Sequence, residues 1–100
     1  MVRYLTLLKF TSQGAKMMEK STDRANTFQR EATAAGIHVE SMYWCQGGLH
    51  DGILIMSAPD EHTALRQLAL LKKTGNVTTE CSRLFTAAEF DVLIGLRKDG

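Results

Sequence analysis

The sequence predicts an α+β fold in which a four-stranded antiparallel sheet carries two helices on one face, with a further helix at the C-terminus. Four segments have the alternating or unbroken apolar pattern of strands, and two segments between them have apolar residues at helical spacing. Their order is strand, helix, strand, strand, helix, strand, and a glycine-rich stretch lies where a hairpin must join the two middle strands. Right-handed crossovers turn this order into a ferredoxin-like βαββαβ sandwich.

Length and composition predict one globular domain over residues 1–100. The chain is 44% hydrophobic and 23% charged, and its 12 basic and 11 acidic residues leave a net charge of +1. The basic residues are scattered, which argues against a nucleic-acid partner. No run approaches the ~20 apolar residues of a membrane span, and the opening residues lack the pattern of a secretory leader. We therefore expect a cytoplasmic protein with no membrane partner.

The first half of the chain predicts one strand and two helices. Residues 2–10 alternate in the manner of a strand, with leucine on both faces. A short helical piece follows from Gln13 to Lys20. A longer helix opens at Ser21 or Thr22 and runs to Ala35, and its apolar stripe predicts that it packs against the sheet.

The second half predicts three strands and two helices. The strands run from Ile37 to Cys45, from Gly52 to Ser57 and from Asn76 to Phe85. Asp60 caps the helix before the last strand, and Gly75 closes it. Thr86 and Glu89 have the spacing of a capping box, which predicts the terminal helix.

Three glycines mark the central hairpin. Gly47 and Gly48 predict the turn, because glycine adopts a positive φ without steric strain. Gly52 predicts either a bulge or a close backbone approach within the third strand. The unbroken apolar run over residues 53–56 favours a strand that is buried on both sides.

Apolar residues on both strand faces predict a partner for the sheet. The two helices cover one face, and a small domain commonly hides a second apolar face against another molecule. We expect a homo-oligomer, in the simplest case a dimer that packs sheet against sheet.

Several sequence blocks resemble the GYD-domain family, in matching order over nearly the whole chain. The blocks are Tyr4 through Gly14, Ser41-Met42-Tyr43-Trp44, Asp51-Gly52, Ala58-Pro59-Asp60, and Gly75-Asn76-Val77 with Thr79-Glu80. The resemblance implies a small bacterial protein of the dimeric α+β barrel kind, and it implies no established activity. The Gly-Tyr-Asp signature of the family stands here as Leu49-His50-Asp51-Gly52, so no role of the usual tyrosine transfers, whereas Asp51 and Gly52 do.

The sharpest catalytic candidates are His50, Asp51 and Cys45, which lie together around the hairpin. A histidine oriented by a carboxylate can move protons, and a cysteine beside a cation can act as a nucleophile. The alternative is that Asp51 braces the turn through its N–H groups while His50 is solvated and Cys45 is inert. The histidines and cysteines lack the spacing of a zinc site, so we expect no metal and no cofactor.

Four further residues are candidates for ligand binding. Met42, Trp44 and Met56 flank the hairpin and are suited to wall an apolar pocket, although core or oligomer packing explains them equally well. Lys9 lies on a central strand, where it either binds an acidic ligand, pairs with Glu80 or reaches solvent past its aliphatic stem.

These residues are compatible with three classes of function. The favoured one is a dimeric protein that binds a small molecule or has a structural accessory role. The second is a cofactor-poor monooxygenase or isomerase with a site near residues 45–52, which rests on fold analogy. The third is a protein-interaction module that uses an exposed strand edge.

Overall fold

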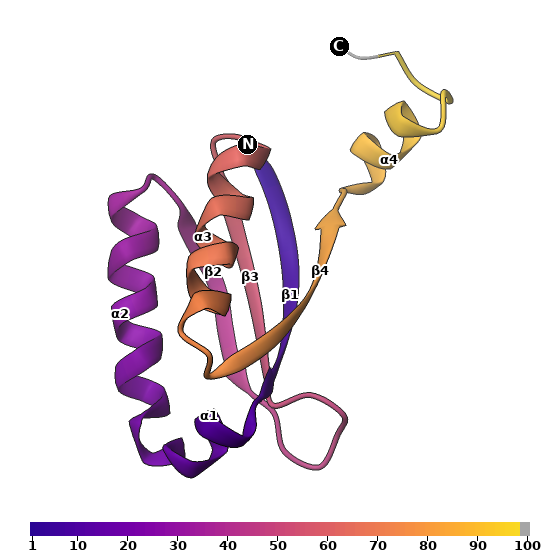
Figure 1. Cartoon of the computed structure of the whole chain (residues 1–100). Helices are drawn as coiled ribbons and strands as arrows, with labels where there is room; N and C mark the ends of the chain where they lie inside the picture. Colours follow the sequence, from indigo (N-terminus) through magenta and orange to yellow (C-terminus); the bar gives the residue numbers. More distant parts are fainter. Residues whose placement is uncertain (99–100) are drawn as a thin grey trace.

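The computed structural model describes residues 1–98 and confirms the predicted α+β fold with its four-stranded antiparallel sheet. The elements are β1 (Val2–Phe10), α1 (Ser12–Lys16), the 3₁₀ turn η1 (Met18–Lys20), α2 (Ser21–Ala34), β2 (His38–Trp44), β3 (Gly52–Ala58), α3 (Glu61–Lys73), β4 (Val77–Leu84) and α4 (Ala87–Leu93). The sheet order is β2-β3-β1-β4, so β1 is an inner strand, as a ferredoxin-like fold requires. The helices α2 and α3 lie over one face of the sheet, and α4 stands apart beyond the end of β4 (Figure 1).

The core lies between the sheet and the two covering helices. Its buried hydrophobic residues are Tyr4, Phe28, Ala32, Ile37, Leu54, Met56, Ala58, Ala64 and Leu68. The alternation in β1 explains the arrangement, because Tyr4 and the fully buried Thr6 face the helices while Leu5 and Leu7 face the other way. The threonine hydroxyl is satisfied by Cys81, whose Sγ atom lies 3.7 Å from Thr6 Oγ1.

Local signals set the helix ends close to where the sequence predicts them. The carboxylate of Asp60 accepts the N–H of Thr63 at 2.7 Å and caps α3. The capping box of α4 forms as predicted, with Thr86 and Glu89 each accepting the other's backbone N–H. The short helical piece predicted from Gln13 to Lys20 is divided between α1 and η1.

The hairpin between β2 and β3 is wider than a two-residue turn. The loop spans residues 45–51, and of its two glycines only Gly47 has a positive φ, at 87°. The irregular pairing lies between Val39 and Ser41, so the bulge belongs to β2 and not to Gly52. At Gly52 an added Cβ would lie 3.4 Å from the carbonyl oxygen of Tyr43, at the edge of ordinary van der Waals contact.

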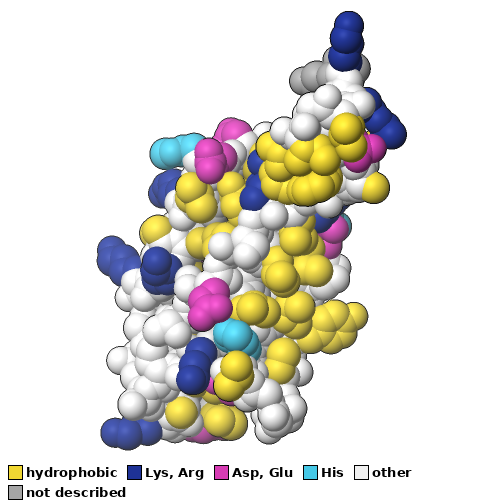
Figure 2. Space-filling view, turned by 90° about the vertical axis from the view of Figure 1, so that its right-hand side faces the viewer, with side chains coloured by type: hydrophobic (Ala, Val, Ile, Leu, Met, Phe, Trp, Pro, Cys, Tyr) yellow, Lys and Arg dark blue, Asp and Glu magenta, His cyan; other side chains and the backbone are white. Residues whose placement is uncertain are grey.

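The second face of the sheet, which we call the open face, carries no helix. Leu5 and Leu7 of β1 and Ile53 and Ile55 of β3 point to this face and are only half-buried. The prediction that residues 53–56 are buried on both sides therefore holds on the helix side alone. Apolar side chains also gather on α4, and this apolar surface continues below α4 along the same side of the molecule (Figure 2).

Candidate binding cleft

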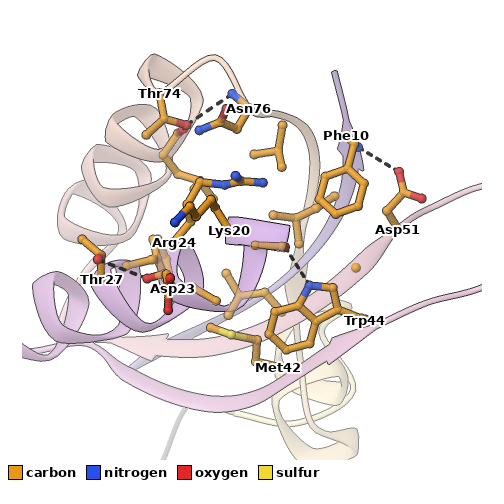
Figure 3. Close-up of a pocket in the computed structure, with 18 of the residues that line it drawn as sticks. Phe10, Lys20, Asp23, Arg24, Thr27, Met42, Trp44, Asp51, Thr74 and Asn76 are labelled. Carbon is orange, nitrogen blue, oxygen red and sulfur yellow. Dashed lines mark hydrogen bonds between the residues drawn. The ribbon is translucent and has the colours of Figure 1, made fainter. Parts of the chain in front are cut away.

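A cleft of about 520 Å³ opens between α2, α3 and the helix-covered face of the sheet. Its walls are mainly apolar and come from both covering helices and all four strands, with side chains that include Phe10, Phe28, Met42, Trp44, Leu54 and Leu71. The cleft reaches the surface at the end of the sheet where α2 begins and α3 ends (Figure 3). Concave, mostly apolar spaces of roughly 300–1,000 Å³ are typical of small-molecule sites.

Gln67 of α3 places a polar group in this apolar wall. The residue is 3% exposed and lines the cleft, and its amide makes no hydrogen bond with any residue in the range 1–98. In this same range, every fully enclosed side-chain nitrogen or oxygen has a hydrogen-bond partner. The small exposed part of Gln67 is therefore its amide, which faces the cleft and is free to bond whatever enters.

Lys20 and Arg24 bring two cations to the opening of the cleft (Figure 3). They are four residues apart, so they lie on one side of the start of α2. The guanidinium of Arg24 donates to the carbonyl of Met17 at 2.8 Å. Across the described part of the chain, neither cation has a carboxylate within ion-pair distance.

Trp44 ties the sheet to α2 at the side of the cleft. Its indole Nε1–H donates to the hydroxyl of Ser21 at 2.9 Å, which joins the end of β2 to the first residue of α2 (Figure 3). The side chain is 46% exposed, and it is the single tryptophan of the sequence. Trp44 is therefore both a wall of the cleft and a natural spectroscopic reporter of it.

Asp51 braces the hairpin against β1 at the edge of the cleft. Its Oδ2 atom accepts the N–H of Phe10 at 2.8 Å (Figure 3). Its own N–H donates to the carbonyl of Leu8, and its carbonyl accepts the N–H of Cys45, both at 2.8 Å. The carboxylate therefore bonds the backbone of β1, and not the N–H groups of the turn that the sequence offered as the alternative to catalysis.

The other predicted site residues lie away from the cleft. His50 contacts Glu80 at 3.4 Å, and Lys9 is exposed on the open face, on the side opposite the cleft. Met56 is fully buried in the core, whereas Met42 and Trp44 line the cleft. The hairpin candidates therefore do not converge: Asp51 lines the cleft, Cys45 is half-buried, and His50 turns toward β4.

The perturbed titratable groups serve the scaffold. Burial, and then the neighbouring Glu61 carboxylate, raise the pKa of Tyr4 above 10.0, while the Arg83 cation opposes the rise. Hydrogen bonds from the backbone N–H and side chain of Thr63 lower the pKa of Asp60, and those from Thr86 lower the pKa of Glu89. None of these three residues lines the cleft.

Two segments far apart in the sequence meet at the end of the sheet where the cleft opens. Thr11 donates its N–H to Asn76 at 3.1 Å and its hydroxyl to the carbonyl of Gly75 at 2.7 Å. Gln13 donates to the side chain of Asn76 at 3.0 Å. Gly14 lies so close to Asn76 that a Cβ would sit 2.0 Å from its carbonyl oxygen. These contacts fix α1 against the loop that precedes β4.

The two segments belong to blocks that a family model recognises. The model of the GYD domain matches residues 4–94. The chain belongs to the GYD domain family. In this GYD domain, the block from Tyr4 to Gly14 and the block from Gly75 to Val77 contact each other at the cleft. No curated protein matches the chain.

The described part of this GYD domain contains no helix long and apolar enough to span a membrane. Within the same residues, no three histidine, cysteine, aspartate or glutamate side chains are grouped so that they could hold a metal ion.

Sequence reasoning missed Lys20, Arg24 and Gln67. The signals were present but slight: two cations at helical spacing, and a glutamine on the apolar stripe of α3 between Ala64 and Leu68.

Proposed function

We propose that this GYD domain binds a small, largely apolar molecule in the cleft between α2, α3 and the sheet. The observation that carries the proposal is the Gln67 amide, which is enclosed by apolar walls and has no protein partner in residues 1–98. Among residues 1–98 no fully enclosed side-chain nitrogen or oxygen lacks a partner, so this amide is open to the cleft and can bond water there. A ligand that bonds the amide and covers the apolar walls replaces that water.

Binding fits the geometry better than catalysis at the hairpin does. The Asp51 carboxylate already accepts the N–H of Phe10, and His50 is directed to Glu80 instead of the cleft. A general base must reach its substrate within hydrogen-bond distance. The cleft offers apolar contact and the amide of Gln67, which are the means of holding a molecule in place.

The test uses the indole N–H resonance of Trp44 in an NMR titration with naphthylethanol, a neutral probe. We expect a saturable shift of this single resonance, because the indole forms a wall of the cleft. Ala25→Phe fills the cleft and should abolish the shift, whereas Ala69→Phe, on the exposed side of α3, should leave it unchanged. Equal responses of the two folded variants, or no response of the parent protein, would contradict the proposal.

We further propose that the protein works as a homodimer in which the open face and α4 are covered by a second copy. The accessible surface is 6688 Å², whereas a compact monomer of 11.1 kDa exposes about 5,700 Å². The excess of about 1,000 Å² is close to the ~800 Å² that each partner hides in a standard interface. The radius of gyration, 15.0 Å, likewise exceeds the ~13 Å of a compact 100-residue domain.

A second copy is favoured over a different partner, because the same chain carries both uncovered apolar surfaces, the open face and α4. The apolar residues of α4 are exposed, with Phe90 at 49%, Leu93 at 59% and Ile94 at 52%. Their surface continues below α4 along the side of the molecule (Figure 2). In a two-fold dimer the two copies cover each other's patches reciprocally, and a net charge of +1 produces little repulsion.

A further inference from the structure

We infer that the cleft prefers molecules that carry an anionic group, such as a carboxylate, on an apolar body. The inference rests on the proposed binding function and adds the charge of the ligand. It assigns the anionic group to Lys20 and Arg24 at the opening and the apolar body to the walls around Phe28 and Trp44.

The two cations are available to a ligand. Lys20 is exposed, Arg24 is half-buried, and neither forms an ion pair with a carboxylate among residues 1–98. Lys20 ends η1 and is the N-cap of α2, and Arg24 follows four residues later within α2, so both cations lie at the start of this helix and line the same opening. A charge-assisted hydrogen bond from each would be stronger than any bond that a neutral group can form there.

The carboxylates that line the cleft leave this position free. Asp51 is engaged by the N–H of Phe10. Glu31 follows Arg24 by seven residues on α2, which places it about 10 Å further along the helix axis. Asp23 is exposed in the first turn of α2 and lines the cleft beside Arg24. Lys20 and Arg24 outnumber this carboxylate, so an anion at the opening meets a net positive charge.

The apolar walls and Gln67 complete the description of the ligand. Phe28, Trp44 and Leu71 line the space that follows the two cations. Gln67 precedes Thr74 by seven residues on α3, so it lies deeper in the cleft than the opening. The molecule that fits has its charge at the opening, an aromatic or aliphatic body in the middle and room for a hydrogen-bonding group at the deep end.

The test compares two probes of one shape, naphthylacetate and naphthylethanol, through the Trp44 indole resonance. We expect both to bind, with naphthylacetate at least tenfold tighter at neutral pH. If both bind with equal affinity, the preference for anions is overturned while the binding function stands. If neither shifts the resonance, the binding function itself fails, and the inference fails with it.

Charge variants locate the anion. Lys20→Glu should reduce the affinity for naphthylacetate tenfold or more and leave the affinity for naphthylethanol unchanged. The variant should fold normally, because the Lys20 side chain makes no hydrogen bond in the described structure. Lys16→Glu in α1, outside the cleft lining, is the matched control and should change neither affinity. Arg24→Met provides a second test in a variant first shown to be folded, because the guanidinium also donates to the carbonyls of Met17 and Gly14, and it should weaken the binding of naphthylacetate more than that of naphthylethanol. An anion preference that survives both Lys20→Glu and Arg24→Met would overturn the assignment.

Discussion

At position 14 the backbone of α1 passes against the backbone of Asn76 with no room for a side chain. A Cβ on Gly14 would lie 2.0 Å from the carbonyl oxygen of Asn76 and 2.9 Å from its carbonyl carbon. Both atoms belong to the main chain, so neither can rotate away. This single residue therefore sets how closely the β1–α1 segment approaches the start of β4.

Gly14→Ala should destabilise the protein by about 1–3 kcal/mol, the usual cost of overpacking a close contact. Chemical denaturation followed by circular dichroism measures the change. Gly48→Ala is the matched control, because no atom lies within 4 Å of an added Cβ there and its φ is not positive. Equal stability of the two variants would show that the segments do not pack as described.

Gln67 allows the proposed binding to be tested by changing one side chain. Gln67→Met keeps the length of the side chain and removes the amide that lacks a partner in residues 1–98. We expect probe affinity to fall with little change in the free energy of unfolding, because the amide is open to the cleft and not enclosed in the core. Denaturation and the Trp44 titration on the same sample measure both. A less stable variant would mean that the amide serves the fold.

The helices show which features of this protein can be predicted locally. The capping box at Thr86 and Glu89 and the cap at Asp60 depend on residues three apart in the sequence, and both form as predicted. The cleft depends on how far α2 and α3 stand apart at one end, which no local pattern reports. For the same reason, the sequence predicted Met42 and Trp44 as pocket residues but missed Lys20 and Arg24, whose role depends on α3 lying opposite them.

The cap of α3 predicts how stability responds to acid. Hydrogen bonds from Thr63 hold the pKa of Asp60 below its ordinary value of 3.8. The carboxylate therefore stabilises the fold above the unfolded-state pKa, and this contribution is lost as the pH falls through the lower folded-state pKa. The melting temperature of the parent protein should drop more between about pH 6 and pH 2.5 than that of Asp60→Asn.

The control for this experiment is Asp23→Asn, since the Asp23 side chain makes no hydrogen bond within the described residues. It should keep the full acid dependence of the parent. If the melting temperatures of Asp60→Asn and the parent protein depend on pH in the same way, the Asp60 carboxylate does not contribute to the acid dependence of stability.

On the scale of the whole molecule, the shape is the one expected of a single protomer of the proposed dimer. The sheet is covered on one side only, and α4 projects from the end of β4 without packing on the body (Figure 1). A helix of seven residues is too short to be stable on its own, because isolated helices below about 12–15 residues are marginal in water. The sequence indicated the uncovered face through leucine and isoleucine on both strand faces, but it gave no indication that α4 projects.

Sedimentation equilibrium should therefore give a mass of about twice 11.1 kDa at micromolar concentration. Ile55→Asp on the open face and Leu93→Asp on α4 should each shift the protein toward the monomer, because they place a charge in the proposed interface. Leu65→Asp on the outer side of α3, which is 46% exposed, is the control and should leave the mass unchanged. A parent protein that sediments as a monomer would rule out the dimer.

The most direct test of the proposed function is a set of intermolecular nuclear Overhauser effects between naphthylacetate and the protein. The account predicts contacts from the naphthyl protons to Phe28, Met42 and Trp44, which line the cleft. Contacts confined to the open face, at Leu5 and Ile55, or to the exposed side of α4 would contradict it, because the probe would then be bound outside the cleft.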